Sequence, residues 1–204
     1  MPPLPEDLDR LLHDLRGPLN AAVMHLEVIR RLIREGDAAH ASVDTIQQEL
    51  LRLASLLPAA FDVVALERGE LTVVNLRDLV ERALKEQSLG SVVLAEGPWP
   101  EVRVDERLVA LAVGHLVRNA LQSTAAAGAA RPPRVSASGS GSRQVALTVR
   151  DWGRGLRSTN PKVLVRLRGV GLVTAERVAR LHGGALTFGS PGDGAEVTLT
   201  LPAA

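Results

Sequence analysis

The chain has 204 residues, 46% of them hydrophobic, which is enough for one large domain or two small ones with packed cores. It contains no cysteine, so disulfides, thiol nucleophiles and thiolate metal sites are excluded. The net charge of +1 and the aromatic content of 2% argue against general binding to nucleic acid or to membrane surfaces.

The amino-terminal segment and the most apolar stretch both bear on localisation. Residues 1–7 do not resemble a signal peptide. The stretch 50–66 contains Arg52, Pro58 and Asp62, which makes it a poor membrane span. We therefore expect a cytoplasmic protein with no membrane partner and no sensor segment of its own.

Two long helices are predicted, one at residues 6–36 and the other at 41–67. Pro58 is expected to kink the second helix or to end it early. In both helices, apolar or small residues recur at alternating steps of three and four, which is a heptad repeat. They are Leu8, Leu12, Leu15, Leu19, Ala22, Leu26, Ile29 and Ile33, then Val43, Ile46, Leu50, Leu53, Leu57, Ala60 and Val64. Because a lone antiparallel hairpin leaves apolar surface in water, we expect a homodimeric four-helix bundle rather than packing within one chain.

From residue 70 onward the pattern changes to short strands alternating with helices. Asn75 and Asp105 are expected to cap two of these helices. The helices are predicted at 76–87, 106–123 and 169–181, and the strands at 71–74, 91–95, 135–138, 145–150, 185–188 and 195–201. The predicted fold class is α+β, with a helical hairpin over 1–69 and, over 70–204, an α/β sandwich of mostly antiparallel strands with helices on one face.

His13 is the first candidate functional residue, because it lies next to Asp14 on the first predicted helix. It follows the seam residue Leu12, so its ring is expected at the solvent-accessible edge of the seam. A neutral imidazole is a good nucleophile toward phosphorus, and Asp14 is placed to orient the ring or to take its proton. An exposed histidine beside an aspartate is also common without any function. The Gly17-Pro18 break in the heptad helix favours the functional interpretation.

Two glycine-rich segments suggest a nucleotide pocket. Asp151 follows a predicted strand, where its carboxylate can accept a hydrogen bond from an exocyclic amine such as that of adenine. Gly153 and Gly155 let the backbone lie against a flat ring or turn sharply. Gly169 and Gly171 open a helix, whose first backbone N–H groups and dipole favour phosphate. Each segment alone is weak, because turns often use the same residues.

Polar residues inside apolar helices supply the remaining candidates. Asn119 needs a partner for its amide, and a bound Mg²⁺ and a purely structural hydrogen bond both remain open. His115 lies one turn earlier on the same side and is a candidate for lining the pocket. His25 and His40 are expected at exposed positions, and His182 at a helix end, where a cation suits the dipole. No pair of histidines has convincing metal spacing.

The order of these motifs resembles the catalytic core of bacterial two-component sensor histidine kinases, over residues 6–202. Residues 13–19 resemble the phosphoacceptor motif of that family, and 115–120 its asparagine motif. Residues 151–155 and 169–172 resemble its two glycine motifs. The resemblance implies a dimerisation and phosphotransfer hairpin followed by an ATP-binding domain of the GHKL (Bergerat) type.

By this resemblance, the cofactors are ATP and Mg²⁺. His13 would accept the γ-phosphoryl group, Asp14 would assist as acid and base, and Asn119 would coordinate Mg²⁺. Asp151 would bind the adenine amino group, and the pocket would be shaped by Gly153, Gly155, Gly169 and Gly171. The expected partners are a second copy of the chain, the receiver domain of a response regulator, whose aspartate takes the phosphoryl group, and a separate sensor protein if there is an input signal.

The chain also departs from the family pattern. Gly17 stands where the family often has threonine or asparagine, which predicts weak dephosphorylation of a partner regulator. His115 replaces the first asparagine of its motif, and Leu167 replaces the leading glycine of the second glycine motif. The segment between the glycine motifs is short. The alternative functions are therefore an ATP-independent dimeric histidine phosphotransfer protein and a non-catalytic scaffold with a degraded ATP site.

Overall fold

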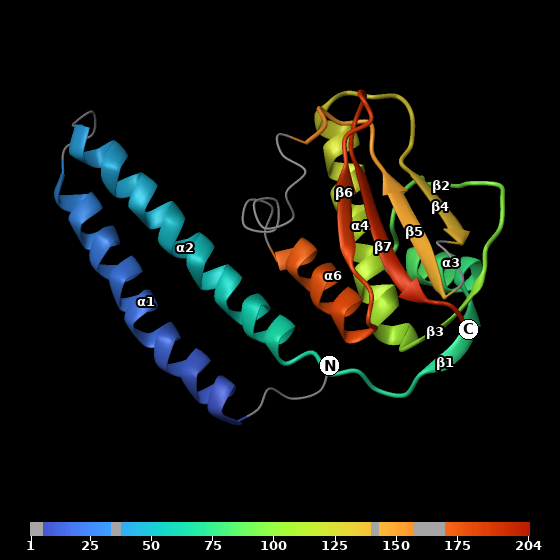
Figure 1. Ribbon diagram of the computed structural model, residues 1–204. Helices are drawn as coiled ribbons and strands as arrows, with labels where there is room; N and C mark the ends of the chain where they lie inside the picture. Colours follow the sequence, from blue (N-terminus) through green and yellow to red (C-terminus); the bar gives the residue numbers. More distant parts are fainter. Residues whose placement is uncertain (1–5, 34–37, 140–142, 157–169) are drawn as a thin grey trace. The chain divides into compact units, whose positions relative to one another are not determined.

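The computed structural model of the chain describes residues 6–33, 38–139, 143–156 and 170–204 (Figure 1). The chain divides into two compact units, one ending at Ala65 and the other beginning at Leu66. We had placed the boundary after residue 69. It lies earlier because the side chain of Leu66, only 2% exposed, belongs to the hydrophobic core of the second unit.

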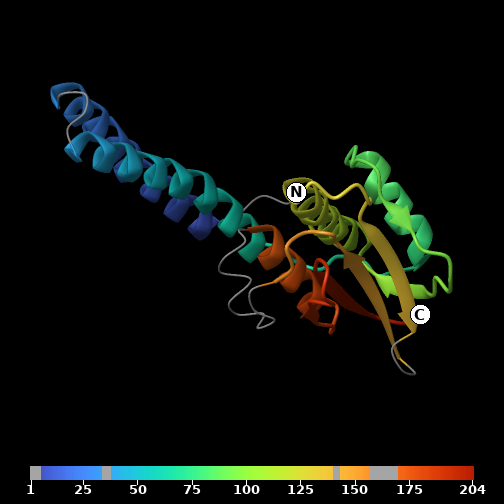
Figure 2. The same ribbon diagram turned by 90° about the horizontal axis from the view of Figure 1, so that it is seen from above.

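The first unit, which we call the helical unit, is a hairpin of two helices, α1 (Glu6–Leu32) and α2 (Ala38–Val64). They run side by side in both views (Figure 1 and Figure 2). Arg30 pairs with Asp44 at 3.0 Å, which joins the carboxyl end of α1 to the amino end of α2 as an antiparallel hairpin requires. Both helices end earlier than predicted. The expectation that Pro58 ends α2 early is wrong, because the helix continues through it to Val64.

The second unit contains a five-stranded sheet in the order β2-β4-β5-β7-β6. The strands are β2 (Val93–Leu94), β4 (Arg134–Gly139), β5 (Gln144–Arg150), β6 (Leu186–Gly189) and β7 (Glu196–Pro202). β2 and β4 are parallel, whereas all other neighbours are antiparallel. The two predicted hairpins, β4–β5 and β6–β7, are confirmed, and so is the mostly antiparallel character of the sheet.

A small second sheet pairs β1 (Thr72–Asn75) with β3 (Glu101–Val104) in antiparallel fashion. We did not expect β3, which follows directly after a turn containing Pro98 and Pro100. Its inward side chains, Val102 and Val104, are both 0% exposed. The alternation of buried and exposed residues extends over only four positions, so the sequence gives little signal for this strand.

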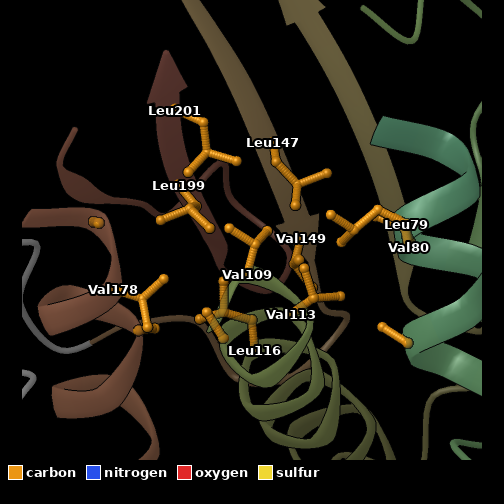
Figure 3. Packing of buried hydrophobic residues seen from close by; sticks show 14 of the residues in the cluster. Leu79, Val80, Val109, Val113, Leu116, Leu147, Val149, Val178, Leu199 and Leu201 are labelled. Atoms are coloured by element: carbon orange, nitrogen blue, oxygen red, sulfur yellow. The ribbon is translucent and has the colours of Figure 1, made fainter. Parts of the chain in front are cut away.

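Three helices cover one face of the five-stranded sheet: α3 (Leu76–Glu86), α4 (Glu106–Ala126) and α6 (Val170–Leu181). Both predicted caps are confirmed, because Asn75 accepts a hydrogen bond from the Arg77 amide and Asp105 accepts one from the Leu108 amide. Figure 3 shows the core between these layers, where Leu79, Val113 and Val178 from the helices face Leu147 and Leu199 from the sheet. The fold class is α+β, as predicted. No helix within the described ranges has the length and apolarity needed to cross a membrane.

Candidate functional site

A hollow lies between α4, the start of α6 and the ends of three strands of the five-stranded sheet. Its described lining residues are Leu116, Asn119, Ala120, Val149, Asp151, Leu156, Leu172, Phe188 and Val197. Two of the predicted site residues, Asn119 and Asp151, therefore meet in one cavity. Most of the other lining side chains are apolar, which suits a flat, weakly polar ring.

Asp151 lies directly after β5 and is only 5% exposed. Its carboxylate oxygen Oδ1 accepts hydrogen bonds from the backbone N–H groups of Gly153, at 2.8 Å, and Ala195, at 3.1 Å. No hydrogen bond joins Oδ2 to the described part of the chain. The carboxylate is thus held in place by one oxygen, while the other is left to accept from a donor in the hollow.

Asn119 is half-buried on α4, between Leu116 and Ala120. Its side-chain nitrogen Nδ2 is buried and has no hydrogen-bond partner among the described residues. A purely structural asparagine would need such a partner, because an unsatisfied buried amide is destabilising by about 1–3 kcal/mol. Asn119 thus has an amide nitrogen that no described residue satisfies, as a candidate ligand-binding group would. A side-chain amide offers an oxygen, which is what Mg²⁺ requires, and an N–H₂ group for an acceptor such as phosphate.

The glycines of the first motif lie where a larger residue would be strained or would clash. A Cβ atom on Gly153 would come closer than 3.0 Å to the Ser123 hydroxyl on α4. Gly155 has a φ of 75°, a conformation that favours glycine. The sequence analysis predicts that these glycines let the backbone lie against a flat ring or turn sharply, and the φ of Gly155 fits the second of these roles. In the structure Gly153 lets the loop after Asp151 pack tightly against the end of α4.

Gly194 is a site residue that the sequence reasoning missed. It has a φ of 89°, and a Cβ atom there would come closer than 3.0 Å to the carbonyl oxygen of Asp151. The next residue, Ala195, donates one of the two hydrogen bonds to the Asp151 carboxylate. The sequence Pro-Gly-Asp-Gly at 191–194 predicts a turn, but it does not say against which residue the turn packs.

The second glycine motif is only partly described. Gly169 lies outside the described residues. Gly171 is in the first turn of α6, where a Cβ atom would lie 3.1 Å from Nδ1 of His115. His115 therefore packs against α6 and is not among the residues described as lining the hollow, which corrects our expectation. Its burial, followed by the nearby charge of Arg118, lowers the pKa of His115 below its usual range.

The predicted phosphoacceptor segment lies on α1. His13 and Asp14 fall within the helix, but their side chains lie outside the described residues. Gly17 and Pro18 follow at exposed positions, and the helix continues through them to its end at Leu32. The structure thus places the segment on a continuous helix.

Two other histidines differ from expectation. His40 is half-buried rather than exposed, with its Nε2 atom 3.9 Å from Asp44. His182 lies at a helix end as expected, directly after α6, but it is only 4% exposed. Its Nε2 atom accepts a hydrogen bond from the Asp105 amide at 3.0 Å, and its Nδ1 atom lies 2.8 Å from the Val178 carbonyl, to which it donates. This pattern requires a neutral ring with its proton on Nδ1.

Trp152, the residue after Asp151, is held in place by hydrogen bonds of its side chain and of its backbone. Its indole N–H donates to the carbonyl of Pro132 at 2.8 Å, and its backbone N–H donates to the Thr124 hydroxyl on α4 at 3.1 Å. The guanidinium of Arg150 lies 4.5 Å from the ring centroid. The indole ring thus connects the loop after α4 to the segment that follows β5, one residue after Asp151.

The fold and this site agree with a comparison against models of protein families. Residues 104–204 match the model of the histidine kinase-, DNA gyrase B-, and HSP90-like ATPases. This part of the chain belongs to that family. The histidine kinase-like ATPase domain begins at the last residue of β3 and includes Asn119, Asp151 and Gly171. We call the second unit, from residue 66 onward, the ATPase unit.

Solved structures are similar over longer stretches. Full-length ShkA in complex with AMPPNP matches with a TM-score of 0.61 and 22% identity, over 99% of this chain and 46% of ShkA. The Acinetobacter baumannii histidine kinase AdeS matches with a TM-score of 0.58 and 18% identity, over 94% of this chain and 98% of AdeS. At these identities the similarity shows the fold, including the helical region before the ATPase domain.

The ATP-binding domain of PrrB from Mycobacterium tuberculosis is 26% identical, with a TM-score of 0.54, over 67% of this chain and 99% of the PrrB domain. The chain spans about half the length of ShkA. A comparison with curated protein sequences finds no significant match.

Proposed function

We propose that the chain is an ATP-dependent protein-histidine kinase that phosphorylates His13. The observation that carries the proposal is that one hollow holds both the anchored carboxylate of Asp151 and the side-chain amide of Asn119, whose nitrogen has no partner among the described residues. The family of the ATPase domain supports ATP as the ligand, as does the AMPPNP complex of the similar protein ShkA. The helical hairpin that precedes the domain supplies the candidate acceptor.

The hollow suits the adenine end of ATP. The Oδ2 atom of Asp151 can accept the exocyclic N–H of adenine, because Oδ1 is already occupied by backbone donors. The ring would lie between apolar side chains such as Val149, Leu172 and Phe188. Asn119 would hold Mg²⁺ through its side-chain oxygen, and the ion would neutralise charge on the phosphates.

In the proposed reaction, an imidazole nitrogen of His13 attacks the γ-phosphorus of ATP. A nitrogen–phosphorus bond forms, and the bond between the γ-phosphorus and the bridging oxygen breaks, so that ADP leaves. Asp14 takes the proton that the ring gives up. The phosphoryl group would then pass from His13 to an aspartate of a response regulator's receiver domain. Gly17 has no side chain to position a water, so the regulator is expected to be dephosphorylated only weakly.

The helical unit also supports a homodimer. The predicted heptad residues of α2 occupy two positions: Val43 and Leu50, at the first, are buried or half-buried, whereas Ile46 and Leu53, at the second, are 49% and 47% exposed. A single partner helix covers only one of the two heptad positions, whereas a four-helix bundle covers both. The exposed half of the repeat therefore fits a second copy of the hairpin.

An exposed apolar stripe on α1 points the same way. Met24, Val28 and Leu32 recur at steps of four and are 71%, 56% and 80% exposed. Such steps place the three side chains on one face of the helix. Together with the exposed positions of α2, this stripe leaves apolar side chains of both helices in contact with water in the single chain, where a second hairpin could cover them.

The test is incubation of the full chain with γ-labelled ATP and Mg²⁺. We expect acid-labile, alkali-stable label on the wild type and none on His13→Gln. His25→Gln is the matched control, because His25 is an exposed histidine on the same helix, and it should keep the label. Asp151→Asn should weaken nucleotide binding by about tenfold or more, through loss of a charged acceptor.

The alternatives give different results in the same assay. No label from ATP, together with acceptance of phosphate from a phosphorylated receiver domain, would point to the ATP-independent phosphotransfer protein. Failure of both reactions would leave the scaffold. Label that persists on His13→Gln would refute His13 as the acceptor.

A further inference from the structure

The four residues that follow the helical unit, 66–69, are bound tightly to the ATPase unit. We call them the connector. The guanidinium of Arg68 donates to the carbonyl of Leu181, at the end of α6, at 2.8 Å. Arg177 of the same helix donates to the carbonyl of Leu66 at 3.5 Å, and the Leu66 side chain is in the core. The connector and α6 therefore each donate a side-chain hydrogen bond to a backbone carbonyl of the other.

Asp105 attaches the other end of the connector. Its Oδ2 atom accepts a hydrogen bond from the Gly69 amide at 2.9 Å, while its Oδ1 atom caps α4 through the Leu108 amide. Arg107 adds a longer hydrogen bond to the carbonyl of Glu67 at 3.5 Å. Because Asp105 is only 5% exposed, both of its hydrogen bonds are shielded from water.

His182 joins these two attachments. It is buried at the end of α6, and its Nε2 atom accepts the hydrogen bond of the Asp105 amide. Its Nδ1 proton is used by the Val178 carbonyl. Both ring nitrogens are thus hydrogen-bonded to backbone groups. Nδ1 is bonded to α6, and Nε2 to Asp105, the residue that caps α4. Nothing in the proposed chemistry uses this buried histidine.

We propose that Asp105 and His182 are positioning residues, which fasten the connector to the start of α4 and to the end of α6. Other residues of these two helices, Asn119 and Leu172, line the nucleotide hollow. The attachment point of the helical unit is thereby set by the same helices that hold the nucleotide. Its role in phosphoryl transfer rests on the proposed function, whereas the fastening rests only on the contacts above.

The fastening is tested by hydrogen–deuterium exchange of the full chain. In His182→Leu the acceptor for the Asp105 amide is lost, and we expect amide exchange in the connector to become about tenfold faster. Exchange in the part of α4 around Asn119 should stay unchanged. His182→Gln should restore slow exchange, because its side-chain oxygen can accept the same hydrogen bond. Equal acceleration in both segments would show a general core role and would overturn the proposal.

A second pair of variants decides the matter if His182→Leu does not fold. Arg68→Ala removes one surface hydrogen bond to α6 and should accelerate connector exchange several-fold. Arg103→Ala is the matched control, because Arg103 is an exposed arginine on β3 for which the described residues show no ion pair. Unchanged connector exchange in Arg68→Ala also overturns the proposal.

The autophosphorylation assay separates a positioning role from a structural one. In a folded His182→Leu variant we expect a lower kcat with an unchanged KM for ATP, because the hollow is intact while the attachment of the helical unit is loose. A raised KM with an unchanged kcat would contradict this. If the wild type takes no label from ATP, the proposed function fails, and the exchange results still decide the fastening.

Discussion

The helical unit and the ATPase unit bury their apolar residues to very different extents. In the ATPase unit, Leu147, Leu199 and Leu201 are each 0% exposed, and helices and strands share one core. In the described part of the helical unit, only Val43 and Val63 count as buried hydrophobic residues, at 8% and 7%. The ATPase unit therefore has a hydrophobic core of its own, whereas the hairpin leaves most of its apolar side chains at least partly exposed, which is consistent with the proposed dimer.

The largest effect is expected from truncating a core side chain of the ATPase unit. Leu147→Ala should lower the free energy of unfolding of this unit by about 2–5 kcal/mol, through lost transfer energy and a cavity. Urea unfolding followed by circular dichroism measures it. Leu53→Ala, in the helical unit, is the control and should leave the transition of the ATPase unit in place. If the two variants shift that transition equally, the units do not have separate cores.

A steric change at the site should have the next largest effect. Gly194→Ala forces a Cβ atom against the Asp151 carbonyl and should destabilise the ATPase unit by about 2–3 kcal/mol while weakening nucleotide binding. Gly192→Ala is matched to it, because Gly192 also has a positive φ, 82°, but open space around the position of a Cβ atom. Equal affinity of the two variants for a fluorescent ATP analogue would contradict the role given to Gly194.

These two glycines illustrate what could be predicted from the sequence. The turn at 191–194 was predictable, because its residues specify the local backbone. The packing of Gly194 on Asp151 was not, since it depends on the pairing of β5 with β7. The caps at Asn75 and Asp105 were likewise local and were predicted correctly. The burial of His182 depends on a contact with Asp105, which is far away in the sequence.

The difference between local features, which the sequence predicts, and contacts between distant residues, which it does not, also applies to the candidate site. Asn119 was found because it interrupts an apolar helix, and Asp151 because it follows a predicted strand and precedes two glycines. Their meeting in one hollow could not be derived from their spacing. β3 was missed because its pairing is long-range: a helix and another strand separate it along the chain from its partner strand β1.

The exposed heptad positions predict a smaller but decisive effect on assembly. Leu53→Glu introduces a charge at a position that is 47% exposed in the single chain and that the proposed dimer would bury. We expect dimer dissociation to increase by about tenfold or more, with the ATPase unit unaffected. Sedimentation velocity measures the change. Arg52→Glu, at the neighbouring exposed position, should leave the dimer intact, and a wild type that sediments as a monomer would refute the bundle.

The smallest effect concerns pH and should be confined to the ATPase unit. The pKa of His115 is lowered by burial in the folded chain, so the unfolded chain binds its proton more readily. The contribution of neutral His115 to stability is therefore fully present above the unfolded pKa, about 6.5, and is lost as pH falls through the lower folded value. His115→Asn should reduce the decline in the free energy of unfolding between pH 7.5 and pH 5.5, measured by urea titration. His25→Asn, exposed on α1, should leave the decline for the ATPase unit as steep as in the wild type, because its ring belongs to the other unit. An unchanged decline in His115→Asn would mean that His115 does not remain the buried neutral ring that packs against Gly171.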